Sequence, residues 1–237
     1  MPTTIELEDH GSELRALNDW LQLEPGKTAV ITVDMHRGHL DPLEATLPVS
    51  PEDSEAVRGQ AHDLLAFCRS RGTPVIHVIL VQRPVEYGRM NPRMVASRRV
   101  LSKAVPRTEA QKRGVPHNLE GSIQTQLMPE IGPEQGDYVI DTKKTLSIYQ
   151  GTDLDHLLRV LGVDTVALMG INTNTCVLCG AFESANRGYR TIVVSDCTAS
   201  MYGRDLHILA LQNVARCLGW VLTSDELKAK LSATSTP

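Results

Sequence analysis

The sequence predicts an α/β fold, a three-layer α/β/α sandwich around a mostly parallel, doubly wound sheet of about six strands. Short β-branched runs alternate with segments whose apolar residues recur at helical spacing. The runs are apolar at consecutive positions, which is typical of parallel strands covered on both faces. The length of 237 residues is enough for one large domain of this class.

The first strand–helix–strand unit lies near the N-terminus. Residues 27–34 (KTAVITVD) and 73–81 (TPVIHVILV) are the two strand-like runs. Between them apolar residues recur every three or four positions and predict a helix with a buried stripe of Val57, Ala61, Leu64, Leu65 and Cys68. A parallel pair needs such a crossover, which is expected to be right-handed.

The same alternation returns in the C-terminal half of the chain. The strand-like runs there are residues 137–141, 164–170, 191–196 and 220–222. One helix between them is expected to start near residue 175. Two others are predicted from apolar stripes, formed by Leu154, Leu157, Leu158 and Leu161 and by Leu206, Ala210, Val214 and Cys217.

Residues 82–136 interrupt this alternation. The segment is rich in proline (84, 92, 106, 116, 129, 133) and arginine (83, 89, 93, 98, 99, 107, 113). We therefore expect a single domain over residues 1–237 with an irregular insertion at about 82–136, which carries functional residues or meets a neighbouring subunit. The final residues, ATSTP, are expected to be a short flexible tail.

Composition narrows the class of partner. The formal net charge is −4, so no sequence-wide attraction to nucleic acid or to a membrane surface is expected, and a small molecule or a protein is the better partner. No apolar run approaches the length of a membrane span, and the acidic, polar start differs from a secretory signal. Five cysteines fit free thiols in a reducing compartment, so a cytoplasmic location is expected.

Three residues with chemical potential follow strand-like runs. Asp34 ends the first run, Lys143 follows DYVIDT, and Cys176 follows ALMGINTNT at the start of a predicted helix. Ligands of doubly wound sheets bind beyond the carboxyl ends of the strands, so these side chains are expected to meet. A carboxylate, an ammonium group and a thiol together supply a nucleophile, a proton acceptor and a charge that favours thiolate.

The surrounding motifs resemble those of the isochorismatase-like cysteine hydrolases, in particular the amidohydrolase branch. AVITVDMHRG matches the strand that ends in the family's aspartate, and KKTLSIYQGTDL matches the lysine motif, in which Lys143 lies nine residues before Thr152. GINTNTCV matches the motif that contains the cysteine, and HNLEGSIQTQLMPEI resembles the segment before the middle strand. The likeness covers most of the chain and implies the same Rossmann-like fold.

The resemblance implies a mechanism. Cys176 is the nucleophile, Asp34 the base and acid, and Lys143 the cation, while the backbone N–H groups of Asn172 and Cys176 form the oxyanion hole. The family also has a cis peptide bond, here between Ile171 and Asn172. The reaction is cleavage of the C–N bond of a small amide, carbamoyl, imide or lactam substrate through a thioester, with release of ammonia or an amine. No cofactor is expected.

The chain departs from related sequences around the pocket. VQRPVEYGRMNPRM replaces the metal-binding Asp-Trp-His of nicotinamidases, so a metal is not expected, although a cluster of His36, His39 and Asp41 is an alternative. His36 fills a position usually held by Gln, and His39 is expected to line the pocket and adjust the substrate fit. The amide of Asn172 is expected to reach the substrate.

The predicted substrate class depends on whether an arginine lines the pocket. If Arg204 or an arginine of the insertion lines the pocket, it can clamp a carboxylate, which favours an N-carbamoyl amino acid or a maleamate-like compound. Without one, a neutral urea derivative, imide or lactam fits better.

Two other functions compete with hydrolysis. CVLC has the spacing of a redox pair, so a thiol redox protein using Cys176 and Cys179 is one alternative. A non-catalytic interaction module on the same fold is the other. A homodimer or homotetramer is expected because the family associates through the insertion and adjoining helices.

Overall fold

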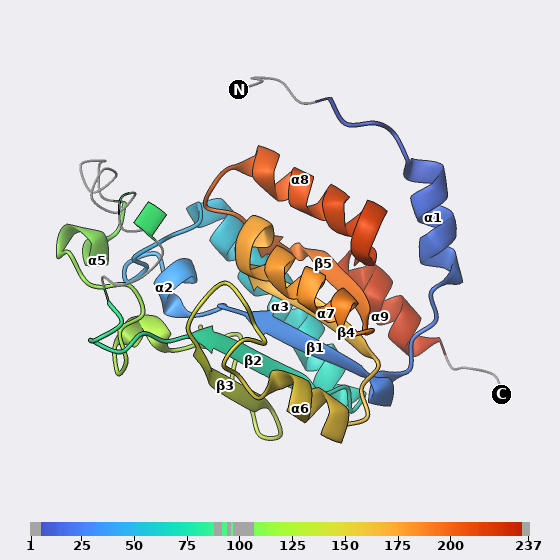
Figure 1. Cartoon of the computed structure of the whole chain (residues 1–237), viewed down its shortest axis with the longest axis horizontal. Helices are drawn as coiled ribbons and strands as arrows, with labels where there is room; N and C mark the ends of the chain where they lie inside the picture. The colour runs from blue at the N-terminus through green and yellow to red at the C-terminus, as the bar shows by residue number, and fades with distance from the viewer. Residues whose placement is uncertain (1–5, 88–91, 94–95, 97–106, 234–237) are drawn as a thin grey trace.

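The computed structural model describes residues 6–87, 92–93, 96 and 107–233 (Figure 1). A single six-stranded parallel sheet runs through it in the order β3-β2-β1-β4-β5-β6. The strand order reverses between β1 and β4, as expected of a doubly wound sheet. The strands are β1 (Thr28–Val33), β2 (Val75–Leu80), β3 (Tyr138–Lys143), β4 (Thr165–Ile171), β5 (Arg190–Ala199) and β6 (Trp220–Leu222).

Helices cover both faces of the sheet and complete the predicted three layers. On one face lie α3 (Pro51–Ser70) and α9 (Ser224–Ser232), and on the other α6 (Leu154–Val160), α7 (Leu178–Asn186) and α8 (Arg204–Asn213). The remaining described helices and helical turns are α1 (Gly11–Trp20), η1 (Pro25–Lys27), α2 (Arg37–Leu40), α5 (Glu109–Lys112), η2 (Ile123–Thr125), η3 (Thr173–Val177) and η4 (Val214–Leu218).

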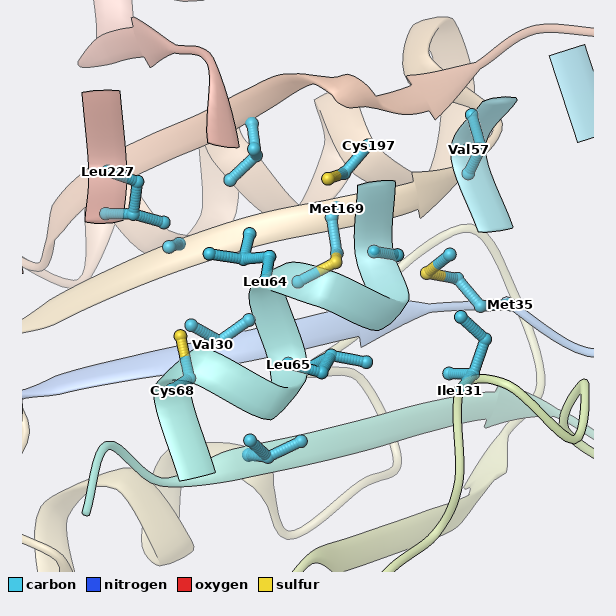
Figure 2. Packing of buried hydrophobic residues seen from close by; sticks show 14 of the residues in the cluster. Val30, Met35, Val57, Leu64, Leu65, Cys68, Ile131, Met169, Cys197 and Leu227 are labelled. Atoms are coloured by element: carbon cyan, nitrogen blue, oxygen red, sulfur yellow. The ribbon is translucent and has the colours of Figure 1, made fainter. Parts of the chain in front are cut away.

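Helix α3 supplies most of the core on its face. Its start follows from Ser50, whose hydroxyl accepts the backbone N–H of Asp53, and from Pro51 at the first helical position. The predicted apolar stripe is buried against β1 and β4, where Leu64 lies near Val30 and Met169 (Figure 2). Each fully buried leucine contributes on the order of 2 kcal/mol to stability.

Two parts of the secondary structure differ from expectation. The helix expected near residue 175 opens as the π-helical turn η3 before α7, and the expected 206–217 helix ends in a second π-helical turn, η4. Helices α1 and α9 are additions to the predicted elements. No residue of α1 is buried, so it leaves no strong apolar stripe, whereas α9 begins with a capping box between Thr223 and Glu226 that is visible in the sequence.

The described part of 82–136 adds no strand to the sheet. It contains α5, η2 and two isolated bridges, His36 with Leu127 and Gln82 with Leu119. Arginines 89, 98 and 99 and tail residues 234–237 lie outside the described residues. The domain limits and the flexible tail stay predictions. Among the helices described, none has the length and apolar character that a bilayer crossing requires.

Strands β1 and β4 approach each other closely at their carboxyl ends. Gly170 has a φ of 118°, and a Cβ atom there would lie 2.1 Å from the Val33 carbonyl oxygen. Only glycine fits this position, because any side chain would collide with backbone. The close approach brings the segment after β4 toward the segment after β1.

Gly170→Ala is therefore expected to destabilise the protein, by about 2 kcal/mol or more, since backbone must move to admit the methyl group. Gly59→Ala is the matched control. Gly59 lies in α3, and a Cβ atom added to it would meet no other atom within 4 Å, so alanine should be neutral or stabilising by about 0.5–1 kcal/mol. Urea denaturation measures both variants, and equal effects would contradict the steric argument.

Candidate active site

The carboxyl ends of the strands bring the three predicted residues together. Asp34 directly follows β1 with a φ of 53°, Lys143 is the last residue of β3, and Cys176 lies in η3 just after β4. The Lys143 Nζ donates to Asp34 Oδ2 at 2.6 Å and to Cys176 Sγ at 3.4 Å. All three side chains are buried, so the ammonium group bridges a carboxylate and a sulfur away from bulk water.

The second Asp34 oxygen is held by the neighbouring strand. Asp34 Oδ1 accepts the backbone N–H of Leu80 at 2.8 Å, and His36 Nε2 lies 3.7 Å from the same oxygen. Asp34 therefore has one oxygen for the backbone and one for Lys143. These two contacts hold the Asp34 carboxylate in place beside Lys143.

Charge and burial set the resting protonation states. Burial alone would raise the pKa of Asp34, but the Lys143 ammonium group holds it below its ordinary value of 3.8. Burial opposes the charge of Lys143, yet Asp34 raises the pKa of that ammonium group. Burial raises the pKa of the Cys176 thiol to about 12, Lys143 lowers it and Asp34 raises it.

The resting site is thus a carboxylate, an ammonium group and a neutral thiol. The sequence pattern favours a thiolate, but burial opposes charge on the sulfur, and the nearby Asp34 carboxylate offsets part of the effect of Lys143. The thiol lies beside the ion pair of Asp34 and Lys143.

A cavity of about 650 Å³ opens beside Asp34 and Cys176. Its lining residues follow the carboxyl ends of the strands. Figure 1 shows α2 and α5 on this side of the sheet. The volume suits a small organic molecule. The lining residues are Asp34, His39, Leu47, Leu80, Gln82, Val85, Glu86, His117, Lys144, Thr145, Leu146, Asn172, Thr175, Cys176 and Tyr202.

Of the other predicted site residues, some line the cavity and one lies away from it. His39 and Asn172 line the cavity, as expected. Arg204 is exposed at the first position of α8 and is not among the lining residues, so the structure does not bring it to the site. His117 and Lys144 line the cavity although the sequence does not single them out, because His117 comes from the irregular insertion and Lys144 adjoins the stronger candidate Lys143.

Asn172 links β4 to the loop after β5. The peptide bond between Ile171 and Asn172 is cis, as the family resemblance implied. The Asn172 Oδ1 atom accepts the backbone N–H of Met201 at 2.9 Å, so this half of the amide is used within the protein. The neighbouring Thr173 hydroxyl bonds to His207 Nδ1 at 2.8 Å. These contacts hold the turn that carries Cys176.

The histidines after β1 do not form a metal cluster with Asp41. Asp41 Oδ1 accepts the backbone N–H groups of Leu43 and Glu44, and Oδ2 pairs with Arg37 at 2.7 Å. Its carboxylate therefore closes a turn. Within the described ranges, no group of three or more potential ligand side chains converges on a point that could hold a metal ion.

His36 is held by a residue that the sequence did not identify. Asn118, from the insertion, donates from Nδ2 to His36 Nε2 at 2.6 Å and to the Leu80 carbonyl oxygen at 2.9 Å. Burial lowers the pKa of His36 to about 3, so its ring is neutral and accepts this hydrogen bond. Asn118 thus ties the loop after β1 to the end of β2, beside Asp34. Its only sequence signal is its place in the HNLEGS segment.

The fold and this cluster define a class of protein: an α/β protein with a buried aspartate, lysine and cysteine at the carboxyl ends of the strands of a parallel sheet. Comparison with known families gives the particular family. The model of the isochorismatase domain matches residues 28–226, which is most of the chain. The chain therefore belongs to the isochorismatase family, and the family resemblance predicted from the motifs is confirmed.

Curated relatives extend over most of the chain. A maleamate amidohydrolase of Pseudomonas putida is 28% identical over 205 residues, covering 86% of this chain and 87% of the relative. A ureidoacrylate amidohydrolase, RutB, of Methylobacterium radiotolerans is 29% identical over 223 residues, covering 89% and 82%. The family thus includes hydrolases named for C–N bond cleavage, in agreement with the predicted enzyme class.

Solved structures confirm the predicted fold. A cysteine hydrolase from Pseudomonas syringae pv. phaseolicola has a TM-score of 0.74 and 24% identity, with 89% of this chain and 95% of that chain covered. An N-carbamoylsarcosine amidase from Thermoplasma acidophilum has a TM-score of 0.65 and 27% identity, with 84% and 97% covered. The first of these shows likeness of fold alone.

Lys143→Met is expected to lower the free energy of unfolding by about 3–5 kcal/mol near neutral pH, because it leaves the buried Asp34 carboxylate without its cation. Lys144→Met is the matched control. The Lys144 Nζ is partly exposed and donates to the Val81 carbonyl oxygen, so its loss should cost about 1 kcal/mol. Urea denaturation measures both losses.

The loss in Lys143→Met should also depend on pH. In the wild type, the lowered Asp34 pKa gives stability that is present above 3.8 and is lost as the pH falls through the lower folded value. Without Lys143, burial raises the pKa of Asp34, so the folded state gains relative stability as the pH falls toward about 5. Equal losses in the two lysine variants would contradict a buried ion pair.

Proposed function

We propose that this chain is a cysteine-dependent amidohydrolase that cleaves the C–N bond of a small amide, carbamoyl, imide or lactam substrate. The observation that carries the proposal is the contact of one buried ammonium group, that of Lys143, with both Asp34 and Cys176 beside the cavity. Such a cluster contains a nucleophile, a proton acceptor and a fixed charge. Relatives named maleamate and ureidoacrylate amidohydrolase support an amide-type substrate.

Attack begins with transfer of the Cys176 proton. As the sulfur approaches the substrate carbonyl carbon, the thiol proton passes to Asp34 and the carboxylate becomes neutral. Lys143 keeps its proton throughout, and its charge then stabilises the thiolate in place of the carboxylate. Net charge in the cluster does not change, which keeps the step feasible in a buried site.

The tetrahedral intermediate needs donors for its oxyanion. The backbone N–H groups of Asn172 and Cys176 are assigned this role, and one such donor typically contributes about 3–4 kcal/mol to lowering the barrier. Asp34 next gives its proton to the departing nitrogen, so ammonia or an amine leaves and a thioester remains on Cys176. Asp34 then takes a proton from water, which hydrolyses the thioester and releases the acid, and it returns that proton to the Cys176 sulfur as the thiolate leaves.

The lining of the cavity bears on the substrate. No arginine lines it among the described residues, which weakens the predicted guanidinium clamp on a carboxylate. Lys144 is the described cation on the wall, and it already bonds to the Val81 carbonyl oxygen and lies 3.7 Å from Glu86. A small substrate without an obligatory negative charge fits this lining. A cytoplasmic, homodimeric or homotetrameric enzyme without a cofactor completes the proposal.

The redox alternative is less well supported. Cys179 lies on α7, and its sulfur lies 3.9 Å from the Glu183 carboxylate. Burial raises the pKa of Cys179, and the negative charge of Glu183 raises it further. A redox pair also leaves the Asp34–Lys143 contact without a role. The interaction-module alternative has the same weakness.

Cys176→Ala should abolish ammonia release from every active member of a panel of small amides, carbamoyl compounds, imides and lactams. The expected loss is at least about 10³-fold, because the covalent step is removed. Cys179→Ala, three residues away, is the matched control and should stay within about threefold of the wild type. Activity that survives in Cys176→Ala, or is lost only in Cys179→Ala, would refute the proposal.

A further inference from the structure

His39 lines the cavity, and one nitrogen of its imidazole ring is hydrogen-bonded within the protein. Its Nδ1 lies 2.7 Å from the Leu47 carbonyl oxygen. A carbonyl oxygen can only accept, so Nδ1 must carry the proton and donate it. Burial lowers the pKa of His39, which keeps the ring neutral. The Nε2 atom therefore has no proton and presents a lone pair.

This lone pair has no counterpart within the described protein. No described residue donates a hydrogen bond to His39 Nε2, and the atom is not sealed from the cavity. The residue as a whole is only 5% exposed, so bulk water has little access to it. An acceptor that is open to a cavity can receive a hydrogen bond from a ligand, and a ligand that fills the cavity without a donor leaves this acceptor unsatisfied.

The ring is also fixed in orientation. It stacks on His36 with the ring centroids 5.0 Å apart and the planes 18° apart, and His117 packs against it at 5.1 Å and 56°. His36 in turn lies 3.7 Å from Asp34. The His39 ring is thus held in its orientation on the wall of the cavity that Asp34 also lines.

We propose that His39 is a specificity-determining residue, whose Nε2 accepts a hydrogen bond from a substrate N–H group next to the scissile carbonyl. The inference rests on the proposed function. Asp34 gives a proton to the nitrogen that departs, and His39 accepts a hydrogen bond from the N–H group of a second nitrogen. A ureido group carries a nitrogen on each side of its carbonyl, so the site favours ureido compounds that keep this N–H over their N-alkylated analogues.

The physical reason is an unpaired acceptor. An N-methyl analogue has no hydrogen to donate and directs its methyl group at the imidazole lone pair. The acceptor then stays buried and unsatisfied. Sites built around a hydrogen bond discriminate strongly against analogues that lack the donor.

The test compares two neutral probes, N-methylurea and its N-methyl analogue N,N-dimethylurea, by calorimetric binding to the full chain with Cys176→Ala. We expect N-methylurea to bind about tenfold more tightly or better. Adding His39→Phe, which keeps an aromatic ring on His36, should bring the ratio of the two Kd values to about one. A loosened loop alone would weaken both probes and leave their ratio unchanged. His39→Leu is a second acceptor-free variant if the phenylalanine variant does not fold.

Equal affinities before His39 is changed, a ratio that persists after the change, or binding of neither probe would overturn the inference. Ammonia release by the unmodified protein separates this result from the proposed function. A binding preference that His39→Phe removes, with no ammonia release from any ureido compound, would contradict the proposed hydrolase function and support the role of His39. Ammonia release together with equal affinities would support the hydrolase function and contradict the role of His39.

Discussion

The buried ion pair between Lys143 and Asp34 is the interaction on which the rest of the site depends. Neither charge would be tolerated alone at this depth, because burial without a partner carries a penalty of several kcal/mol for each ion. Together they place an ammonium group 3.4 Å from the Cys176 sulfur. The ammonium group of Lys143 can therefore stabilise a thiolate when one forms, while the resting thiol keeps its proton.

The sheet topology makes this pair possible. Asp34 and Lys143 come from strands separated by β2, and β2 itself contributes the Leu80 N–H that holds the other Asp34 oxygen. The close passage of Gly170 against Val33 draws the turn with Cys176 toward the same point. Backbone contacts thus set the geometry, while side chains supply the chemistry.

The sequence predicted the periodic secondary structure and the polar residues that directly follow a strand. Apolar runs and helical stripes gave the sheet and its two layers, and the strand-end rule indicated Asp34, Lys143 and Cys176. It failed where contacts are long-range and irregular. Asn118 and His117 lie in an insertion without periodicity. The raised pKa of the Cys176 thiol comes from burial and from the nearby Asp34 carboxylate, which spacing alone does not reveal. Arg204 looked suitable by type, but it lies exposed at the start of α8 and away from the cavity.

We infer that burial and the Asp34 carboxylate keep Cys176 protonated until Asp34 takes the proton itself. The most direct measurement is the pH dependence of Cys176 alkylation, followed by peptide mass spectrometry, in the wild type and in Asp34→Asn, with exposed Cys217 as the internal reference. The account predicts little Cys176 thiolate in the wild type between about pH 6 and pH 9, and a lower thiol pKa in Asp34→Asn, because Lys143 is then free to pair with the sulfur. A wild-type thiolate near neutral pH, or a thiol pKa that rises in Asp34→Asn, would contradict it.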